Sequence, residues 1–254
     1  GGTVPGPTLR VNQGDLVRVK VVNKSPMPHS IDFHSARIPA NVAYRTFAPG
    51  DSISFEFTAG DPGAYLVHCG TPPITMHIMQ GMYFAIIVDP KGGWGTRADK
   101  EFVIVQSEFY AKDGNVGVMG PDYEAAMSKD ASYVVFNGRA NQYQANPLQV
   151  DEGDRVRFFV GNGGPNLISS FHLIGEVFDN VYKEAGSAAT HNVQTTMIPA
   201  GGAAIVEFGM EVPGDFHFVD HAIFRAGKGA LGTIKVTGAD QVSVFEGASG
   251  PMAH

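Results

Sequence analysis

One pattern of residues occurs twice in this chain of 254 residues, and the repeat limits the folds that the chain can adopt. The segment PTLRVNQGDLVRVKVVN (residues 7–23) matches PLQVDEGDRVRFFVGN (147–162), and DPGAYLVHC (61–69) matches VPGDFHFVD (212–220). The spacing of about 140–150 residues between the copies is the size of a domain. The chain therefore encodes two homologous domains in tandem.

Short runs rich in β-branched and aromatic residues recur in both halves, with Gly, Pro, Asp or Asn between them. Many runs alternate apolar and polar residues, as in LVRVKVV (16–22) and SISFEF (52–57), which is typical of strands with one buried face. This pattern favours antiparallel sandwiches of about seven strands each over a parallel α/β sheet, with helix confined to segments such as 121–130. We predict an all-β fold with little helix, in which residues 1–95 and 96–254 form the two domains.

The charge and hydropathy of the chain narrow its possible partners. The net charge is −7 and no run of Lys or Arg occurs, so nucleic acid is not an expected partner. No apolar run approaches the roughly 18 residues needed to span a bilayer, so we expect a soluble protein with no membrane span. The single cysteine cannot form an intrachain disulfide and carries no signal of compartment. No signal peptide can be recognised, so targeting cannot be read from these residues.

The stretch YLVHCGTPPITMHIMQGM contains the only cysteine, Cys69, and places His77 eight and Met82 thirteen residues after it. A lone cysteine in a sandwich is usually a buried apolar residue. A thiolate, two imidazoles and a thioether, however, are the ligand set of a mononuclear blue-copper site, and PHSIDFH offers the second imidazole. Met79 is a weaker alternative to Met82 as the thioether ligand. We predict a copper site formed by His29, Cys69, His77 and Met82.

Side-chain parity predicts a second metal site. Neighbouring residues of a strand point to opposite faces, so His68 faces away from Cys69. If PHSIDFH is extended, Asp32 and His34 share one face and His29 lies on the other. His34 and His68 would then bind a second metal, with Asp32 beside it. A catalytic site needs a third ligand and an open position, for which the second domain offers His172, His217 and His221. The last two would share a strand face, so spacing does not choose between them.

The chain resembles the copper-containing nitrite reductases over nearly its whole length, on the combined motifs HSIDFH, HCGTPPITMHIMQGM, YVVFNG, VGNGGPNLISSFHLIGEVFDNVY and VDHAIFRAGKGALG. The resemblance implies two tandem cupredoxin-like Greek-key β-sandwiches, assembled as a homotrimer with two copper ions per chain, one type 1 and one type 2. It implies the reaction nitrite + 2H⁺ + e⁻ → NO + H₂O, with a small redox protein, a cupredoxin or a cytochrome c, as electron donor. It also implies a periplasmic or otherwise exported location.

Position by position, the resemblance implies a role for each candidate residue. The residues that resemble ligands of the type 1 copper, which accepts the electron, are His29, Cys69, His77 and Met82. Those that resemble ligands of the catalytic type 2 copper are His34, His68 and, across a subunit interface, His221. Asp32 and His172 resemble the pair that delivers protons, and Ile174 resembles the aliphatic residue that shapes the substrate pocket. The segment SARIPANVAYR departs from the Gly-rich loop of many members, so the resemblance assigns it no role.

Three other functions compete with this one. A two-domain laccase-like oxidase would need many histidines in His-x-His pairs, and the nine histidines of this chain form no such pair. A blue-copper electron carrier would need neither His34 nor His68. A metal-free sandwich would leave the spacing of Cys, His and Met as chance. Copper content separates the four functions, because the reductase would hold two ions per chain, the oxidase four, the carrier one and the scaffold none.

Overall fold

The computed structural model describes residues 2–112, 119–184, 186–239 and 244. Strands dominate this part of the chain, accompanied by four short α-helices and one 3₁₀ turn. The predicted all-β class is therefore confirmed, and the helix expected within residues 121–130 is α3 (Tyr123–Ser128). None of the described helices is long and apolar enough to cross a membrane.

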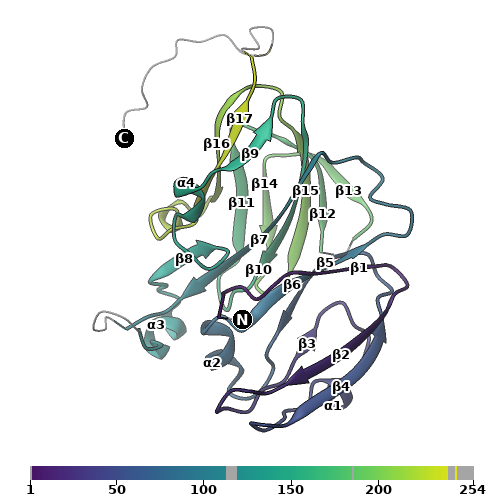
Figure 1. Cartoon of the computed structure of the whole chain (residues 1–254). Helices are drawn as coiled ribbons and strands as arrows, with labels where there is room; N and C mark the ends of the chain where they lie inside the picture. Colours follow the sequence, from purple (N-terminus) through teal and green to yellow (C-terminus); the bar gives the residue numbers. More distant parts are fainter. Residues whose placement is uncertain (1, 113–118, 185, 240–243, 245–254) are drawn as a thin grey trace.

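The first half of the chain, drawn in purple and blue in Figure 1, forms two small sheets. One has the strand order β1-β6-β5-β3 and the other consists of β2 and β4. The elements are β1 (Leu9–Asn12), β2 (Leu16–Val22), β3 (Asp32–Phe33), α1 (Ala40–Ala43), β4 (Ser52–Thr58), β5 (Gly63–His68), α2 (Ile74–Met79) and β6 (Tyr83–Asp89). Among the described residues, these strands pair only with one another.

The second half, drawn in teal, green and yellow, packs a sheet of order β13-β12-β15-β10-β7-β8 against one of order β14-β11-β16-β17-β9 (Figure 1). Besides α3, its elements up to β12 are β7 (Lys100–Phe109), β8 (Tyr133–Phe136), α4 (Gln142–Ala145), β9 (Leu148–Asp151), β10 (Arg155–Asn162), β11 (Ser169–Ile174) and β12 (Phe178–Lys183). The remaining ones are β13 (Ala189–Val193), β14 (Thr195–Ile198), β15 (Ala203–Gly209), β16 (Gly214–Asp220), η1 (Ile223–Arg225) and β17 (Leu231–Thr237).

The repeat in the sequence is also a repeat of strand pairing. β2 pairs with β4 as β10 pairs with β15, and β1 runs parallel to β6 as β9 runs parallel to β17. Asp32 lies opposite His68 in the β3–β5 pair, and His172 lies opposite Val219 in the β11–β16 pair. Because the repeat aligns His68 with Val219, β3 and β11 are equivalent strands. The two halves are therefore built on one framework.

The pairing differs from the predicted one in two respects. Three pairs, β1–β6, β7–β10 and β9–β17, are parallel rather than antiparallel. The halves hold six and eleven described strands rather than about seven each. The alternation of apolar and polar residues along a strand shows which face is buried. It does not show whether the neighbouring strand is parallel or antiparallel, so the sequence cannot predict the parallel pairs. The additional strand β13 is largely exposed, and its residues show little apolar alternation.

The two halves differ in how completely their cores are closed. In the second half Phe158, Phe171 and Phe218 are fully buried, with ring centroids 5.7–6.3 Å apart. In the first half Phe33 is buried, but residues packed around it, such as Val19, are only partly covered. β10 is paired on both edges, by β7 and β15, whereas among the described residues β2 pairs only with β4. One edge of β2 is therefore open.

The halves pack against each other next to the motif that contains Cys69. Leu66 and Tyr83 of the first half pack with Val105 of the second. A Cβ at Gly163 would lie 3.0 Å from the Tyr83 ring, so a larger residue there would force the ring to shift. The strand that leads to Cys69 and the strand that follows its loop are thereby held against the second half.

Candidate functional site

His29, Cys69 and His77 form one group of potential metal ligands. Their ligating atoms lie within 4.8 Å of one another, and Cys69 Sγ is 3.7 Å from His29 Nδ1. His29 is fixed by two backbone hydrogen bonds with Phe47, Cys69 directly follows β5, and His77 lies in α2. The rings of His29 and His77 meet edge to face, with centroids 5.0 Å apart. Three separate segments therefore bring one thiol and two imidazoles together, and the thiol is buried.

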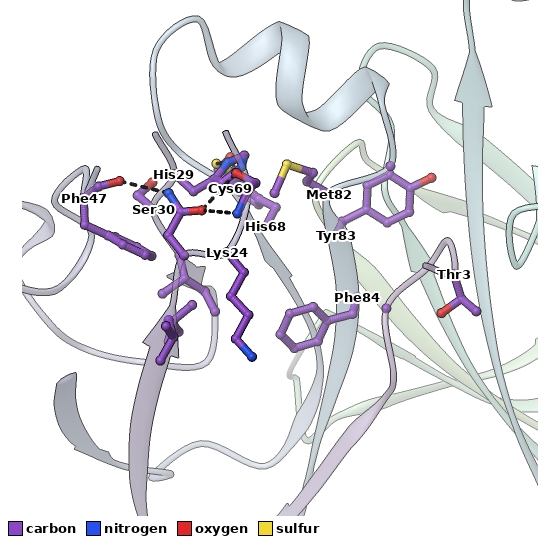
Figure 2. A pocket seen from close by; sticks show the side chains of 17 residues that line it. Thr3, Lys24, His29, Ser30, Phe47, His68, Cys69, Met82, Tyr83 and Phe84 are labelled. Carbon is purple, nitrogen blue, oxygen red and sulfur yellow. Dashed lines mark hydrogen bonds between the residues drawn. The ribbon is translucent and has the colours of Figure 1, made fainter. Parts of the chain in front are cut away.

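Met82 lies beside this group and Met79 does not. The loop from Cys69 to Met82 is closed by hydrogen bonds from Cys69 N to Met82 O (3.1 Å) and from Met82 N to His77 O (3.2 Å). Met82, His29 and Cys69 line one cavity of about 400 Å³, and Figure 2 shows the Met82 side chain extending toward Cys69. Met79 is instead buried in the core of the second half. Of the two methionines, Met82 is the one that lies with the thiol.

Asp32, His34 and His68 form a second group of potential ligands. The Nε2 atoms of His34 and His68 lie 2.8 Å apart, and Asp32 Oδ2 lies 3.9 Å from His68 Nε2. All three ligating atoms lie within 4.8 Å of one another. His68 Nδ1 contacts the carbonyl oxygen of Cys69 at 3.0 Å, which assigns the proton to Nδ1 and leaves Nε2 free to bind a metal. His68 and Cys69 thus belong to different groups, as their parity predicts.

A segment of the second half packs against His34. The carbonyl of Gly201 accepts a hydrogen bond from the His34 ring, and a Cβ at Gly201 would lie 3.5 Å from His34 Cε1. Gly201 has a φ of 82°, which glycine adopts readily. Sequence reasoning did not identify Gly201, although consecutive glycines at 201 and 202 are a signal of close backbone approach. The second half therefore helps to orient a side chain of the first.

One histidine of each group has a lowered pKa and favours the neutral form. Burial lowers the pKa of His29, and the neighbouring His77 lowers it further. Desolvation and then His68 lower the pKa of His34, although Asp32 and the Gly201 carbonyl act in the opposite direction. The neutral ring carries the lone pair that binds a metal. A thiol with two imidazoles, and a second pair of imidazoles with a carboxylate, are donor sets that fit copper.

His172 and His221 lie together on the second half. Their ring centroids are 5.2 Å apart and their planes are inclined at 68°. His172 Nδ1 lies 2.5 Å from the carbonyl oxygen of Gln194, and His221 N donates to Ser170 O at 2.7 Å. Within the part of the chain that the structure describes, neither histidine belongs to a group of three potential ligands. One chain therefore presents the two histidines apart from the pair His34 and His68.

Of His217 and His221, between which the residues alone gave no choice, the structure brings His221 into ring contact with His172. β16 ends at Asp220, so His221 lies beyond the strand and the two histidines do not share a strand face as the sequence suggested. His217 lies opposite Ile174 in the β11–β16 register. Ile174 is 45% exposed and lies two residues after His172, on the same face of β11. His221 is therefore in ring contact with His172, and Ile174 lies on the same face of β11 as His172, whereas the His217 ring bonds to Thr233 Oγ1 at 3.0 Å.

The segment SARIPANVAYR lies beside the second group. The Tyr44 hydroxyl donates to a backbone carbonyl of β3 at 3.2 Å, and both desolvation and the nearby Asp32 raise the pKa of Tyr44. Arg37 makes two hydrogen bonds to Asp61, at 2.7 and 2.8 Å, at a cavity that His34 also lines. The segment therefore supplies a phenol near one carboxylate and an ion pair at an opening beside His34.

Known proteins similar to this chain contain copper. Two family models, both described as multicopper oxidase, match residues 1–93 and 116–239. A copper-containing nitrite reductase of Neisseria gonorrhoeae is 48% identical over 96% of this chain and 64% of its own length. One of Pseudomonas chlororaphis is 31% identical over 100% of this chain and 76% of its own length. A solved copper nitrite reductase from Nitrosomonas europaea is 36% identical, with a TM-score of 0.87 over 94% of this chain and 86% of that one. The chain spans just under two thirds of the length of the curated relatives that it matches at 48% identity.

Proposed function

The chain belongs to the family of copper-containing nitrite reductases, and we propose that it reduces nitrite to nitric oxide by the reaction nitrite + 2H⁺ + e⁻ → NO + H₂O. The observation that carries this proposal is the adjacency of His68 and Cys69, which belong to two different groups of metal ligands. One group has the donors of an electron-transfer site, and the other has the donors of an incomplete catalytic site. A carrier or a scaffold would need only one of these groups, or neither.

The first group would hold the type 1 copper. Cys69 is the thiolate ligand, and its burial shields the sulfur from solvent. His29 and His77 are the imidazole ligands, and the lowered pKa of His29 favours its neutral form. Met82, which lines the same cavity as Cys69, would be the weak thioether ligand. The residues that would hold this copper are His29, Cys69, His77 and Met82.

The second group would hold the type 2 copper with help from another copy of the chain. His34 and His68 present their Nε2 atoms to each other, but two imidazoles are one ligand short of a catalytic site. His221 is the third ligand, and it comes from the neighbouring subunit. Because the first domain of one copy would meet the second domain of the next, the contact is heterologous, and such contacts form a ring when the rotation between copies closes. We propose that the ring has three members.

The surface around His221 supports this assembly. Phe224, three residues after His221, is 90% exposed, and Met197 on β14, the strand beside β11, is 67% exposed. Ile174 is 45% exposed on the same strand as His172. Large apolar side chains that are exposed together mark surfaces that become buried on association. A second copy that covers them would bring Ile174 over the substrate pocket.

Asp32 and His172 would hold and move the protons. Copper, when bound, supplies the redox step and a Lewis-acid centre for the nitrite oxygens. Asp32 Oδ2 lies 3.9 Å from His68 Nε2, so its carboxylate lies beside the position where the type 2 copper and its substrate would bind. The contact of His172 Nδ1 with the Gln194 carbonyl places the proton on Nδ1 and leaves Nε2 as the acceptor. The Asp32 carboxylate and His172 Nε2 can each take up a proton from solvent, hydrogen-bond through it to an oxygen of the substrate and then transfer it.

His68 and Cys69 provide the path between the two groups. The residues are consecutive, so covalent bonds join the thiol of one group to the imidazole of the other. The contact of His68 Nδ1 with the Cys69 carbonyl, at 3.0 Å, offers a second and shorter connection. The electron donor is a small redox protein, a cupredoxin or a cytochrome c, that docks near Met82, whose side chain is 37% exposed. A periplasmic or otherwise exported location would bring the chain to such donors, and fractionation of the host cell would test it.

The decisive experiment combines copper content with NO production. Wild type supplied with nitrite and an artificial reductant is expected to form NO and to hold two copper ions per chain. His221→Ala is expected to keep the visible absorption of the type 1 copper and to lose turnover, whereas the matched variant His217→Ala keeps both. A fully loaded wild type that forms no NO would contradict the function, and loss of colour in His221→Ala would contradict the ligand assignment.

A further inference from the structure

The second domain keeps the place of the type 1 site but not its ligands. The repeat aligns Cys69 with Asp220, and the equivalence of β3 and β11 aligns His29 with Ser169. Asp220 is the residue directly before His221, just as His68 directly precedes Cys69. A carboxylate and a hydroxyl thus occupy the positions that carry the thiol and an imidazole in the first domain.

Asp220 is the centre of a hydrogen-bond network. Its Oδ2 accepts from Gln106 Nε2 and from Arg225 Nη1, both at 2.7 Å. Its Oδ1 accepts from the backbone N–H groups of Ala222 at 3.0 Å and Ser170 at 3.2 Å. Asp220 is 0% exposed, and the Arg225 side chain is 23% exposed. One buried carboxylate therefore ties together four separate positions of the second domain.

The network spans both sheets of the second domain. Gln106 lies on β7 in one sheet and reaches Asp220 on β16 in the other, and its Oε1 accepts from Ser169 Oγ at 2.6 Å. Gln106 and Ser169 are 0% exposed. Arg225 also donates to the carbonyl of Ile168 at 2.6 Å. A buried polar network in which the members are satisfied is rigid, because each broken bond would leave a charge or dipole unpaired in a low dielectric.

This network controls the backbone on both sides of His221. Ala222 N and Ser170 N both bond to Asp220, and His221 N bonds to the carbonyl of Ser170 at 2.7 Å. Among the described residues, the His221 ring has no hydrogen-bond partner, and the aromatic ring that it contacts is that of His172. The direction of the ring is therefore set by the backbone from which it projects.

We propose that Asp220, held by Arg225 and Gln106, is the positioning residue that fixes His221 as a ligand. The inference rests on the proposed function, because it takes His221 to bind the type 2 copper. The position of the second domain that corresponds to Cys69 thus supports the type 2 site instead of binding copper. It acts on His221 through the backbone and touches neither substrate nor metal.

The test is Asp220→Asn in the full chain, which keeps the shape of the side chain and removes the charge that Arg225 and Gln106 share. The type 1 absorption is expected to stay unchanged, while affinity for the type 2 copper falls about tenfold or more and its EPR parameters shift. The matched control is Asp130→Asn. It removes an exposed carboxylate that pairs with Lys228, which lies three residues after Arg225. The control is expected to leave both copper signals as in wild type. An unchanged type 2 signal in Asp220→Asn would overturn the proposal.

Arg225 provides the second arm, because Arg225→Lys keeps a positive charge beside Asp220 and so separates loss of the ion pair from loss of the fold. Arg225→Gln is expected to shift the type 2 EPR signal in the same direction as Asp220→Asn, and Arg225→Lys to restore most of the wild-type signal. Equal effects of Gln and Lys would overturn the role of the ion pair. A wild type that holds type 2 copper but forms no NO would contradict the proposed function alone. A wild type without type 2 copper would contradict both.

Discussion

Asp32 and His172 occupy equivalent positions in the two halves of the chain. Asp32 lies opposite His68 in one strand pair, His172 lies opposite Val219 in another, and the sequence repeat aligns His68 with Val219. In a ring in which the first domain of one copy meets the second domain of the next, equivalent faces meet. The two residues proposed to move protons therefore occupy the same position of the framework, Asp32 in the first domain and His172 in the second.

Asp32→Asn is expected to lower kcat for nitrite by about 10²–10⁴-fold while both copper ions are retained, because the amide cannot take up and release the proton. The pH profile should lose the contribution of this carboxylate. The measurement is kcat against pH together with copper content. Glu56→Gln, which changes a surface carboxylate paired with Arg18, is the control and should behave as wild type. Loss of copper instead would mean that Asp32 is a ligand.

Cys69→Ala is expected to abolish the visible absorption and leave one copper ion per chain. The thiolate supplies the intense charge-transfer colour of a blue-copper site, whereas His34, His68 and His221 do not depend on it. Visible and EPR spectra with a copper assay check this outcome. A variant that keeps its colour would show that Cys69 binds no copper.

Phe224→Glu is expected to prevent assembly, because an uncompensated carboxylate would have to be buried at the contact between copies. The type 2 copper should be lost with the assembly, and the type 1 copper should remain. Light scattering gives the mass, and the EPR spectrum gives the two signals. Met127→Glu is the control, because Met127 is as exposed as Phe224 (85% and 90%) but lies on α3, away from the loop that carries His221 and Phe224. An assembled Phe224→Glu variant would place the interface elsewhere.

Glu108→Gln is expected to change how stability depends on pH. Burial raises the pKa of Glu108, although the N–H groups of Asn166 and Leu167 oppose this by bonding its Oε1. The folded state thus favours the protonated form. The stabilisation that the protonated Glu108 contributes is fully present below the ordinary carboxyl pKa, and it is lost as the pH rises through the raised pKa of the folded state. Gln mimics the protonated form, so the variant should lack this loss in urea unfolding measured across acidic to neutral pH. A pH dependence equal to that of wild type would show that Glu108 does not titrate in this way.

The amides of β2 are expected to exchange with deuterium faster than those of β10. β10 is paired on both edges, and β2 only with β4 among the described residues. Amides that point to an unpaired edge exchange without the opening of a larger unit. Exchange followed by mass spectrometry on peptides covering residues 16–22 and 155–162 compares equivalent strands of one protein. Equal protection in the two peptides would mean that the open edge of β2 is covered in solution.

Much of the strand framework could be predicted from the sequence. LVRVKVV and SISFEF form β2 and β4 at the predicted positions, because alternation of apolar and polar residues is a local property of a strand. The parallel pairs and strands β12 to β14 could not be predicted. The partners of the parallel strands are remote in the chain, and strand direction leaves no mark on local alternation. β12 and β13 lie close together in the chain, but β13 is largely exposed and shows little apolar alternation.

By itself the sequence determined the repeat, the types of donor atom and the assignment of His68 and Cys69 to opposite sides of one strand. These follow from identity, spacing and the period of two residues in a strand, none of which requires knowledge of the chain path. Only the tertiary structure decided that Met82 rather than Met79 lies with the thiol, and that His221 rather than His217 lies beside His172. It also decided that Asp220 is joined to Gln106, 114 residues away in the chain. Such choices depend on distances between remote segments, and these distances are set by the packing of the two sheets.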